Sequence, residues 1–318
     1  MPILAALKPL FDAITANGGG SSGIRTTSEA RALAHAAMER LVTAFYPDTA
    51  RSAREADLSI PVVGGSITVR LYSPEDRGKP LPCHVYYHGG GFWLGTLDHF
   101  DALCRAIARD AHCIVASVDY RLAPEHKFPT APKDCYAALC WLAANAEDLG
   151  VDPTRLSVGG VSAGGNLAAV VSLMARERNG PALCLQVLEV PVLDLSWQDP
   201  LRIADEGIEL PSGKDVYCAY YLRDSAETRL PHVSPLLAPD LHGLPPALIM
   251  CAEYDPLAAE GKAYAERLAS AGVTVEHVCW PGQFHGAQPM AKLIPDEAAA
   301  YQARLVAALK TAYATGDA

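Results

Sequence analysis

The sequence predicts an α/β fold with a mostly parallel central sheet, flanking helices and a helical cap. From Pro82 onward, short apolar segments alternate with longer segments whose apolar residues recur at helical spacing. The short segments are almost continuously hydrophobic, as expected of parallel strands that helices cover on both faces. Residues from about 195 to 237 are polar, aromatic and irregular, so we expect this stretch to leave the sheet.

The individual elements follow from the same patterns. Before Pro82, apolar residues at three- and four-residue steps predict helices over residues 4–14 and 28–45. Two alternating segments on either side of Gly64-Gly65 predict a β-hairpin. Further strands are expected at 82–87, 113–120, 155–160, 183–190, 245–255 and 273–280, and further helices at 98–110, 131–150, 166–178 and 257–272 and near the C-terminus. We expect one domain over residues 1–318, with a cap formed by about residues 1–50 and about residues 195–235.

Composition excludes several classes of partner. The 318 residues carry a formal net charge of −10 without a long run of one sign, which argues against binding to nucleic acid or an anionic membrane. No stretch approaches the length of an apolar membrane span. The nine cysteines form no CxxC pair, so reduced thiols fit better than disulfides or a zinc site. Together with the absence of a signal-peptide pattern at the start, this predicts a cytoplasmic location.

A lone serine stands among glycines in "SVGGVSAGGNLA", residues 157–168. Gly160, Val161, Ser162, Ala163 and Gly164 match the pattern G-x-S-x-G between a predicted strand and a predicted helix. Such a tight turn strains the serine backbone and leaves no room for side chains at the flanking positions. We therefore expect the hydroxyl to project above the carboxyl ends of the strands, where open α/β sheets place their chemistry.

A second glycine-rich stretch, "YYHGGGFWLG" at residues 86–95, ends another predicted strand. Successive glycines leave backbone N–H groups unshielded, and several N–H groups aimed at one point can hold a developing oxyanion. The alternative is a flexible loop without chemistry. Phe92 and Trp93 beside the glycines are either ordinary core residues or the lining of a substrate pocket.

A serine nucleophile needs a base and an orienting acid. Among the ten histidines, His285 follows the last predicted strand, whereas His84 and His277 lie inside strands and His88 precedes the glycines. Two carboxylates compete for the role of the acid, because Asp194 and Asp255 each follow a sheet strand. The pattern of strands alone does not decide which of the two aspartates is the acid.

The motifs "YYHGGGF", "VDYRLAPEHKFP", "SAGGNLAA", "EYDPL" and "HG" occur in order from about residue 55 to the C-terminus. Together they resemble the hormone-sensitive-lipase-like esterases of the α/β-hydrolase superfamily. The resemblance implies the α/β-hydrolase fold, with Ser162 as nucleophile, His285 as base and Asp255 as acid. It also implies an oxyanion hole formed by the N–H groups of Gly90, Gly91 and Ala163. Phe92 and Trp93, from their place beside the glycines, are the candidate substrate-binding residues.

The resemblance implies a carboxylesterase that acts on short- to medium-chain esters through an acyl-enzyme, without metal or cofactor. The expected partner is a small ester substrate, and a homodimer is also implied. An amidase or a lactonase would use the same residues, and a receptor that has lost catalysis is a third alternative. Three residues depart from the family pattern: Val161 replaces an aspartate, Glu189 lies in an apolar strand, and Ala287 replaces an aromatic residue.

Overall fold

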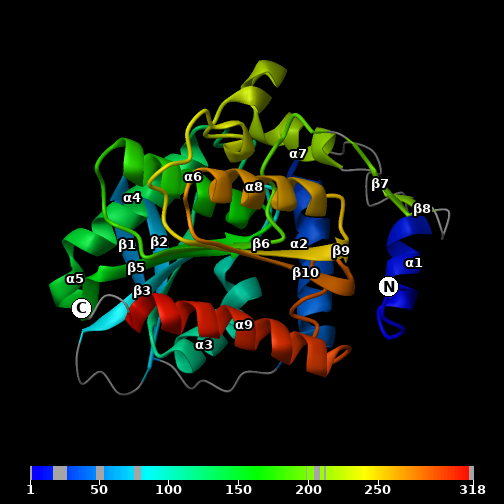
Figure 1. Ribbon diagram of the computed structural model, residues 1–318, viewed down its shortest axis with the longest axis horizontal. Coiled ribbons are helices and arrows are strands. Elements are labelled where there is room, and N and C mark those ends of the chain that lie inside the picture. The colour runs from blue at the N-terminus through cyan, green and yellow to red at the C-terminus, as the bar shows by residue number, and fades with distance from the viewer. Residues whose placement is uncertain are drawn as a thin grey trace.

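A central eight-stranded sheet organises the chain (Figure 1). The computed structural model describes residues 2–16, 27–47, 54–74, 80–197, 199–203, 208–210 and 213–314. The strands of the sheet are β1 (Arg54–Val62), β2 (Gly65–Ser73), β3 (Leu81–Tyr87), β4 (Ile114–Asp119), β5 (Val151–Val161), β6 (Leu185–Glu189), β9 (Ala247–Tyr254) and β10 (Val275–Phe284). Their order is β1-β2-β4-β3-β5-β6-β9-β10. Only the pairs β1–β2 and β2–β4 in this sheet are antiparallel, so the predicted mostly parallel sheet is confirmed.

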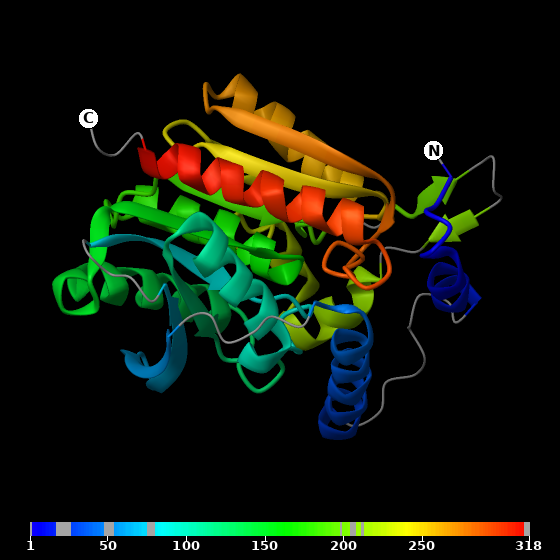
Figure 2. The same cartoon turned by 90° about the horizontal axis from the view of Figure 1, so that it is seen from below.

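Helices cover both faces of the sheet (Figure 1, Figure 2). One face carries α3 (Leu97–Ala111) and α9 (Pro295–Ala314), and the other carries α4 (Thr130–Ala144), α6 (Ala163–Glu177) and α8 (Ala258–Ser270). Successive strand residues enter different layers: Val85 belongs to the core under α4 and α6, whereas Tyr86 belongs to the core under α3 and α9. Because both faces are buried, the strands read as continuously apolar.

Two local features differ from the sequence-based expectation. The segment 131–150 is two helices rather than one, because the chain breaks at Asn145 before the short helix α5 (Ala146–Leu149). The Asn145 side-chain amide donates to the Trp141 carbonyl oxygen at 2.7 Å and occupies the end of α4. β10 is longer than predicted, since its pairing with β9 resumes at Phe284 after a register shift that follows Trp280.

Most of the remaining described elements lie at one end of the sheet, whereas the last of them packs on α6 and α8 (Figure 1, Figure 2). They are α1 (Lys8–Ala16), α2 (Thr27–Phe45), the paired strands β7 (Leu201–Ile203) and β8 (Ile208–Leu210), α7 (Lys214–Tyr221), and the short 3₁₀ helices η3 (Ser225–Arg229) and η4 (Pro235–Leu237). Parts of both expected cap segments, residues 1, 17–26, 48–50, 198, 204–207 and 211–212, lie outside the described residues. Among the helices of the described ranges, none combines the length and apolarity needed to cross a membrane.

Candidate active site

Ser162 occupies the turn between the end of β5 and the start of α6. Its backbone adopts φ 58° and ψ −114°, a conformation that side-chain-bearing residues rarely take. A Cβ atom at Gly160 would lie 2.1 Å from the Tyr87 carbonyl oxygen, and one at Gly164 would lie 1.8 Å from it. The Ser162 N–H donates to the Glu189 carbonyl oxygen at 2.7 Å. The bare flanking positions therefore let β3 pass close enough to hold the turn in its strained form.

His285 and Asp255 lie beside this serine. The Nε2 atom of His285 is 3.0 Å from the Ser162 Oγ atom, and its Nδ1 atom is 2.7 Å from Asp255 Oδ2. The other carboxylate oxygen of Asp255 accepts the Leu257 N–H at 2.9 Å. Asp255 follows β9 and His285 follows β10, so the carboxyl ends of three parallel strands bring the three groups together.

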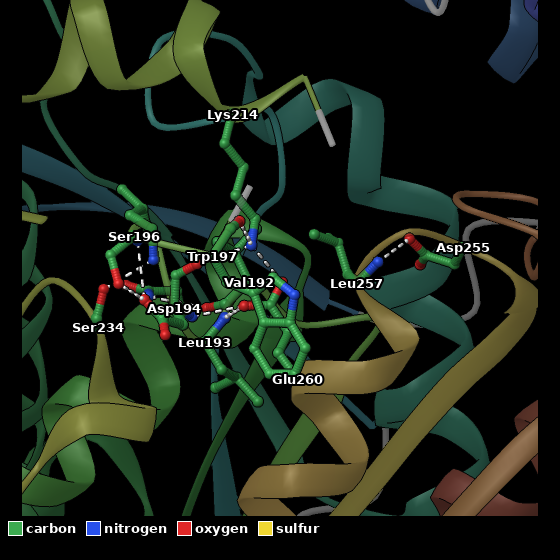
Figure 3. Close-up of polar contacts among 12 residues, drawn as sticks. Val192, Leu193, Asp194, Ser196, Trp197, Lys214, Ser234, Asp255, Leu257 and Glu260 are labelled. Carbon is green, nitrogen blue, oxygen red and sulfur yellow. Dashed lines mark hydrogen bonds and ion pairs between the residues drawn. The ribbon is translucent and has the colours of Figure 1, made fainter. Parts of the chain in front are cut away.

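Asp194, the competing carboxylate, has other partners. Its Oδ1 atom accepts the N–H of Ser196 at 2.8 Å and the hydroxyl of Ser196 at 2.6 Å. Figure 3 shows Asp194 within the turn after β6, apart from Asp255. The Asp194 carboxylate thus closes a turn, and the carboxylate on His285 is that of Asp255.

The contact with Asp255 changes the proton affinity of His285. Burial disfavours the charged imidazolium, but the charge of Asp255, its hydrogen bond and the more distant charge of Glu260 favour it. The favourable contributions prevail, and the pKa of His285 is raised above its ordinary value. This environment suits a group that must take up a proton and then release it.

The other candidate histidines, His84, His88 and His277, lie in contacts that do not involve Ser162. His84 is buried with its Nδ1 atom 2.9 Å from Ser157 Oγ, and burial lowers its pKa to about 3. His88 lies 2.8 Å from the Gly89 carbonyl oxygen and stacks on Tyr120, and burial lowers its pKa to about 4. His277 lies within β10, away from Ser162, and burial lowers its pKa too. None of the three contacts the serine.

Backbone N–H groups converge on the same end of the sheet. In the ranges that the structure describes, no protein acceptor takes the N–H of Gly90, Gly91 or Ala163. Gly90 has φ 123°, and a Cβ atom there would lie 2.3 Å from the Leu94 carbonyl oxygen, so only glycine fits. Ala163 is the first residue of α6, where an N–H group lacks an intrahelical acceptor. Such free donors can bind an anionic oxygen.

A cavity of about 520 Å³ opens above these groups. Residues of α1, α2 and α7 form part of its apolar walls, which include Phe11, Ile14, Met38, Tyr46, Trp93, Val161, Val192, Val216, Tyr217 and Leu257. Ser162, Asp255 and His285 lie at its base with Gly90 and Gly91. In the described part of the chain, no cluster of three or more metal-ligating side chains occurs.

The two aromatic residues of the glycine loop have different surroundings. Trp93 lines the cavity and stacks on Tyr220 at 4.8 Å between ring centroids. Phe92 is fully buried, stacks on Tyr221 at 3.9 Å and is not part of the cavity wall. Phe92 therefore packs the loop against α7 instead of facing the cavity, and we do not retain it as a substrate-binding residue.

Sequence reasoning missed the contribution of α7 to this wall. Val216 and Tyr217 line the cavity, but they lie in a stretch whose pattern indicates only that it leaves the sheet. Sequence reasoning also missed Lys214 and Glu260. These two buried side chains form an ion pair behind the cavity wall. No local sequence signal indicates which side of the sheet such segments face.

The three departures from the family pattern are accommodated in different ways. Val161 is half-buried, lines the cavity and pairs with Glu189 across β5 and β6. Glu189 is buried and accepts a hydrogen bond from the Tyr301 hydroxyl at 2.9 Å, while burial raises the pKa of its carboxyl to about 7. Ala287 is fully buried in a cluster that includes Phe11 and Phe284.

Known proteins share this arrangement. Residues 84–289 match the model of a family described as having the alpha/beta hydrolase fold. The chain is 46% identical to carboxylesterase NlhH of Mycobacterium tuberculosis over 77% of this chain and 78% of that protein. It is 43% identical to an arylesterase of Saccharolobus solfataricus over 68% of this chain and 71% of that protein. A solved hyperthermophilic esterase of the archaeon Pyrobaculum calidifontis superposes with a TM-score of 0.84 at 36% identity, covering 98% of this chain and 99% of that chain. The chain therefore belongs to the hormone-sensitive-lipase-like carboxylesterases of the α/β-hydrolase family.

Proposed function

We propose that this carboxylic ester hydrolase cleaves short- to medium-chain esters through an acyl-enzyme on Ser162. One observation carries the proposal: the hydrogen-bonded series from Asp255 through His285 to Ser162 ends at the base of an apolar cavity. A hydroxyl, a base and an orienting acid within hydrogen-bond reach form the arrangement that activates a serine.

The geometry supports the following reaction. Ser162 Oγ attacks the ester carbonyl carbon while His285 Nε2 takes its proton, and Asp255 stabilises the imidazolium. The free N–H groups of Gly90, Gly91 and Ala163 bind the oxyanion of the tetrahedral intermediate. His285 then donates its proton to the departing alkoxide oxygen. A water molecule, activated by the same histidine, releases the carboxylic acid and restores Ser162.

The cavity supports a limit on acyl length. Its volume of about 520 Å³ accepts a small ester, and its walls are mainly apolar. Each methylene that finds apolar surface contributes about 0.8 kcal/mol, until the chain meets the wall. We therefore expect activity to rise and then fall as the acyl chain is lengthened.

A panel of p-nitrophenyl esters from acetate to palmitate tests the proposal. Ser162→Ala should fold and lose activity by a factor on the order of 10⁶, because no other side chain can form the acyl-enzyme. Ser172→Ala, in which the lost hydroxyl bonds only to the Ala168 carbonyl oxygen on α6, is the matched control and should keep full activity. A serine-directed phosphonate should label the wild-type protein once and fail to label Ser162→Ala. Retention of a tenth of the activity in Ser162→Ala would refute the mechanism, and a maximum at palmitate would refute the chain-length range.

Two other activities compete with this proposal. An amidase or a lactonase would use the same three residues, so an anilide and a lactone belong in the panel. A receptor without catalysis would bind esters without turnover, which the same assay would reveal. The contact between His285 and Ser162 favours turnover, because a binding site alone needs no base on its serine.

Three further parts of the proposal concern the whole chain. We propose that the described parts of residues 1–50 and 195–235 form a cap, since several of their residues line the cavity. A cytoplasmic location is supported by the nine free cysteines. A homodimer is supported by the family resemblance and by the open edge of the sheet at β10, and light scattering of the purified protein tests it.

A further inference from the structure

Lys214 is a buried lysine at the first position of α7. Its side chain is 2% exposed, and its ammonium group donates to the carbonyl oxygens of Asp194 at 2.7 Å and Trp197 at 2.9 Å. Its third partner is Glu260 Oε1, at 2.9 Å. A lysine is almost never fully buried without such partners. Figure 3 shows Lys214 extending from α7 to the turn after β6, where it meets Glu260.

Glu260 reaches the same point from the first turn of α8. Its Oε2 atom accepts the N–H groups of Leu193 at 3.1 Å and Asp194 at 2.5 Å. Burial raises the pKa of Glu260 to about 7, although the charge of Lys214 opposes this change. The carboxylate therefore holds the turn after β6 through one oxygen and α7 through the other.

Each segment joined by this ion pair contributes to the cavity wall. The turn after β6 supplies Val192, α7 supplies Val216 and Tyr217, and the turn before α8 supplies Pro256 and Leu257. A Cβ atom at Gly91 would lie 3.3 Å from the Tyr217 Cβ atom, so α7 also packs against the glycine-rich stretch at residues 89–91. The position of α7 thus decides how much space is left above Ser162.

Resting on the proposed ester hydrolysis, we propose that the Lys214–Glu260 ion pair determines acyl-chain selectivity by fixing α7 as the wall of the cavity. Lys214 is a positioning residue: its ammonium group is enclosed by three acceptors and does not line the cavity. Asp255 is held independently, by His285 and by the Leu257 N–H. Loss of the pair should therefore move α7 and leave the hydrogen-bonded series at Ser162 in place.

Three variants test the proposal on the p-nitrophenyl ester panel. Lys214→Met removes the ammonium group at similar length, and Glu260→Gln weakens the pair while keeping an oxygen for the turn after β6. Breaking one partner of a buried pair can destabilise the fold, so the double variant, which leaves no unpaired charge, is measured as well. Lys262→Met is the matched control, because Lys262 is an exposed lysine on the same helix α8 as Glu260. Melting curves and phosphonate labelling of Ser162 establish that each variant is folded and able to react.

We expect each of the three variants to raise the ratio of kcat/KM for decanoate to kcat/KM for butyrate by about tenfold. A methylene accommodated or rejected by a pocket is worth at least about that factor. Glu260 contributes to the raised pKa of His285, so the assay is run at a pH above the acidic limb of the profile. There the KM for butyrate should rise while kcat changes little, and Lys262→Met should match the wild-type protein. A folded Glu260→Gln or double variant with the wild-type chain-length profile would overturn the proposal. An equal loss of kcat for all chain lengths would also overturn it, because it would place the effect on Asp255 and His285. Failure of Ser162→Ala to lose activity would instead refute the proposed function.

Discussion

The two aspartates after β6 and β9 show how contacts, rather than residue type, assign a role. Both are nearly buried, at 6% exposure for Asp194 and 1% for Asp255. Asp194 binds the backbone and hydroxyl of Ser196, two positions along the chain. Asp255 binds a ring nitrogen of His285, 30 positions away. Only the second contact can influence proton transfer at Ser162.

Replacing each carboxylate by an amide separates these roles. Asp255→Asn should lower kcat by roughly 10³- to 10⁴-fold, because the amide neither stabilises the imidazolium nor maintains the working tautomer of His285. Asp194→Asn, the matched control, should stay within about tenfold of wild type, since an amide oxygen can still accept the hydrogen bonds of Ser196. Steady-state kinetics on butyrate, with melting curves for both variants, gives the ranking. The reverse ranking would move the acid to the turn after β6.

Residual activity of Asp255→Asn carries a second signal. Asp255 raises the pKa of His285, and a base must be neutral to accept a proton, so the acidic limb of kcat/KM reports this pKa. In Asp255→Asn the limb should move to lower pH. An unchanged limb would mean that this limb does not report the contact between His285 and Asp255.

At the scale of elements, β5, the turn at Ser162 and α6 form one unit that depends on the approach of β3. Gly164 belongs to the first turn of α6, and the Tyr87 carbonyl oxygen would lie 1.8 Å from a Cβ atom there. That oxygen is backbone and cannot rotate away. An added methyl group must therefore push α6 from β3 and relax the turn that holds Ser162.

Gly164→Ala should consequently lose most activity and several kcal/mol of the free energy of unfolding, the range of overpacked cores and strained backbones. Gly150→Ala is the control, because its Cβ atom would meet nothing within 4 Å and only the φ of 68° is unfavourable. That control should lose about 1 kcal/mol and keep its activity. Urea denaturation and the butyrate assay measure both effects. Wild-type activity in Gly164→Ala would show that the turn tolerates displacement of α6.

The sequence allowed prediction of the elements whose residues carry their own signal. The apolar strands, the hairpin at Gly64-Gly65 and the pattern around Ser162 each combine a local propensity with a local constraint. Asp255 and Asp194 could not be separated by strand pattern, because the choice depends on which turn meets His285. Tyr217 and Lys214 could not be placed either, since their positions depend on how α7 docks on elements distant in sequence. The break at Asn145 had a weaker signal, a side chain able to bond the backbone.

For the molecule as a whole, Glu189 represents a cost to stability that depends on pH. Its carboxyl is 3% exposed, accepts the Tyr301 hydroxyl and has a pKa of about 7, against an ordinary value of 4.5. The unfolded chain releases this proton near pH 4.5, whereas the folded protein keeps it until about pH 7. The contribution of Glu189 to the free energy of unfolding therefore falls between these two pH values and is constant above them, with a total loss of about 3 kcal/mol.

Glu189→Gln should remove this contribution and leave those of other groups in place. The amide still accepts the Tyr301 hydroxyl but carries no titrating proton, so the variant should gain about 3 kcal/mol relative to wild type between pH 4.5 and pH 8. Denaturant unfolding at several pH values measures how the difference in stability between variant and wild type changes with pH. A constant difference that the amide adds at every pH does not affect this change. Glu147→Gln on the exposed surface of α5 is the control for the loss of one carboxyl group. A constant difference between Glu189→Gln and wild type at all pH values would show that Glu189 titrates normally in the folded protein.

The hydrogen bond between Ser162 and His285 joins residues that are 123 positions apart. Bringing together the ends of so long a stretch of chain loses conformational entropy before the contact between them has formed. A chain in which β5 and α6 have formed but β10 has not docked on β9 would have its serine turn and no base beside it. The return of hydrolysis during refolding would therefore report the docking of β10, whereas amide protection in β5 and α6 would report the local order that this docking requires.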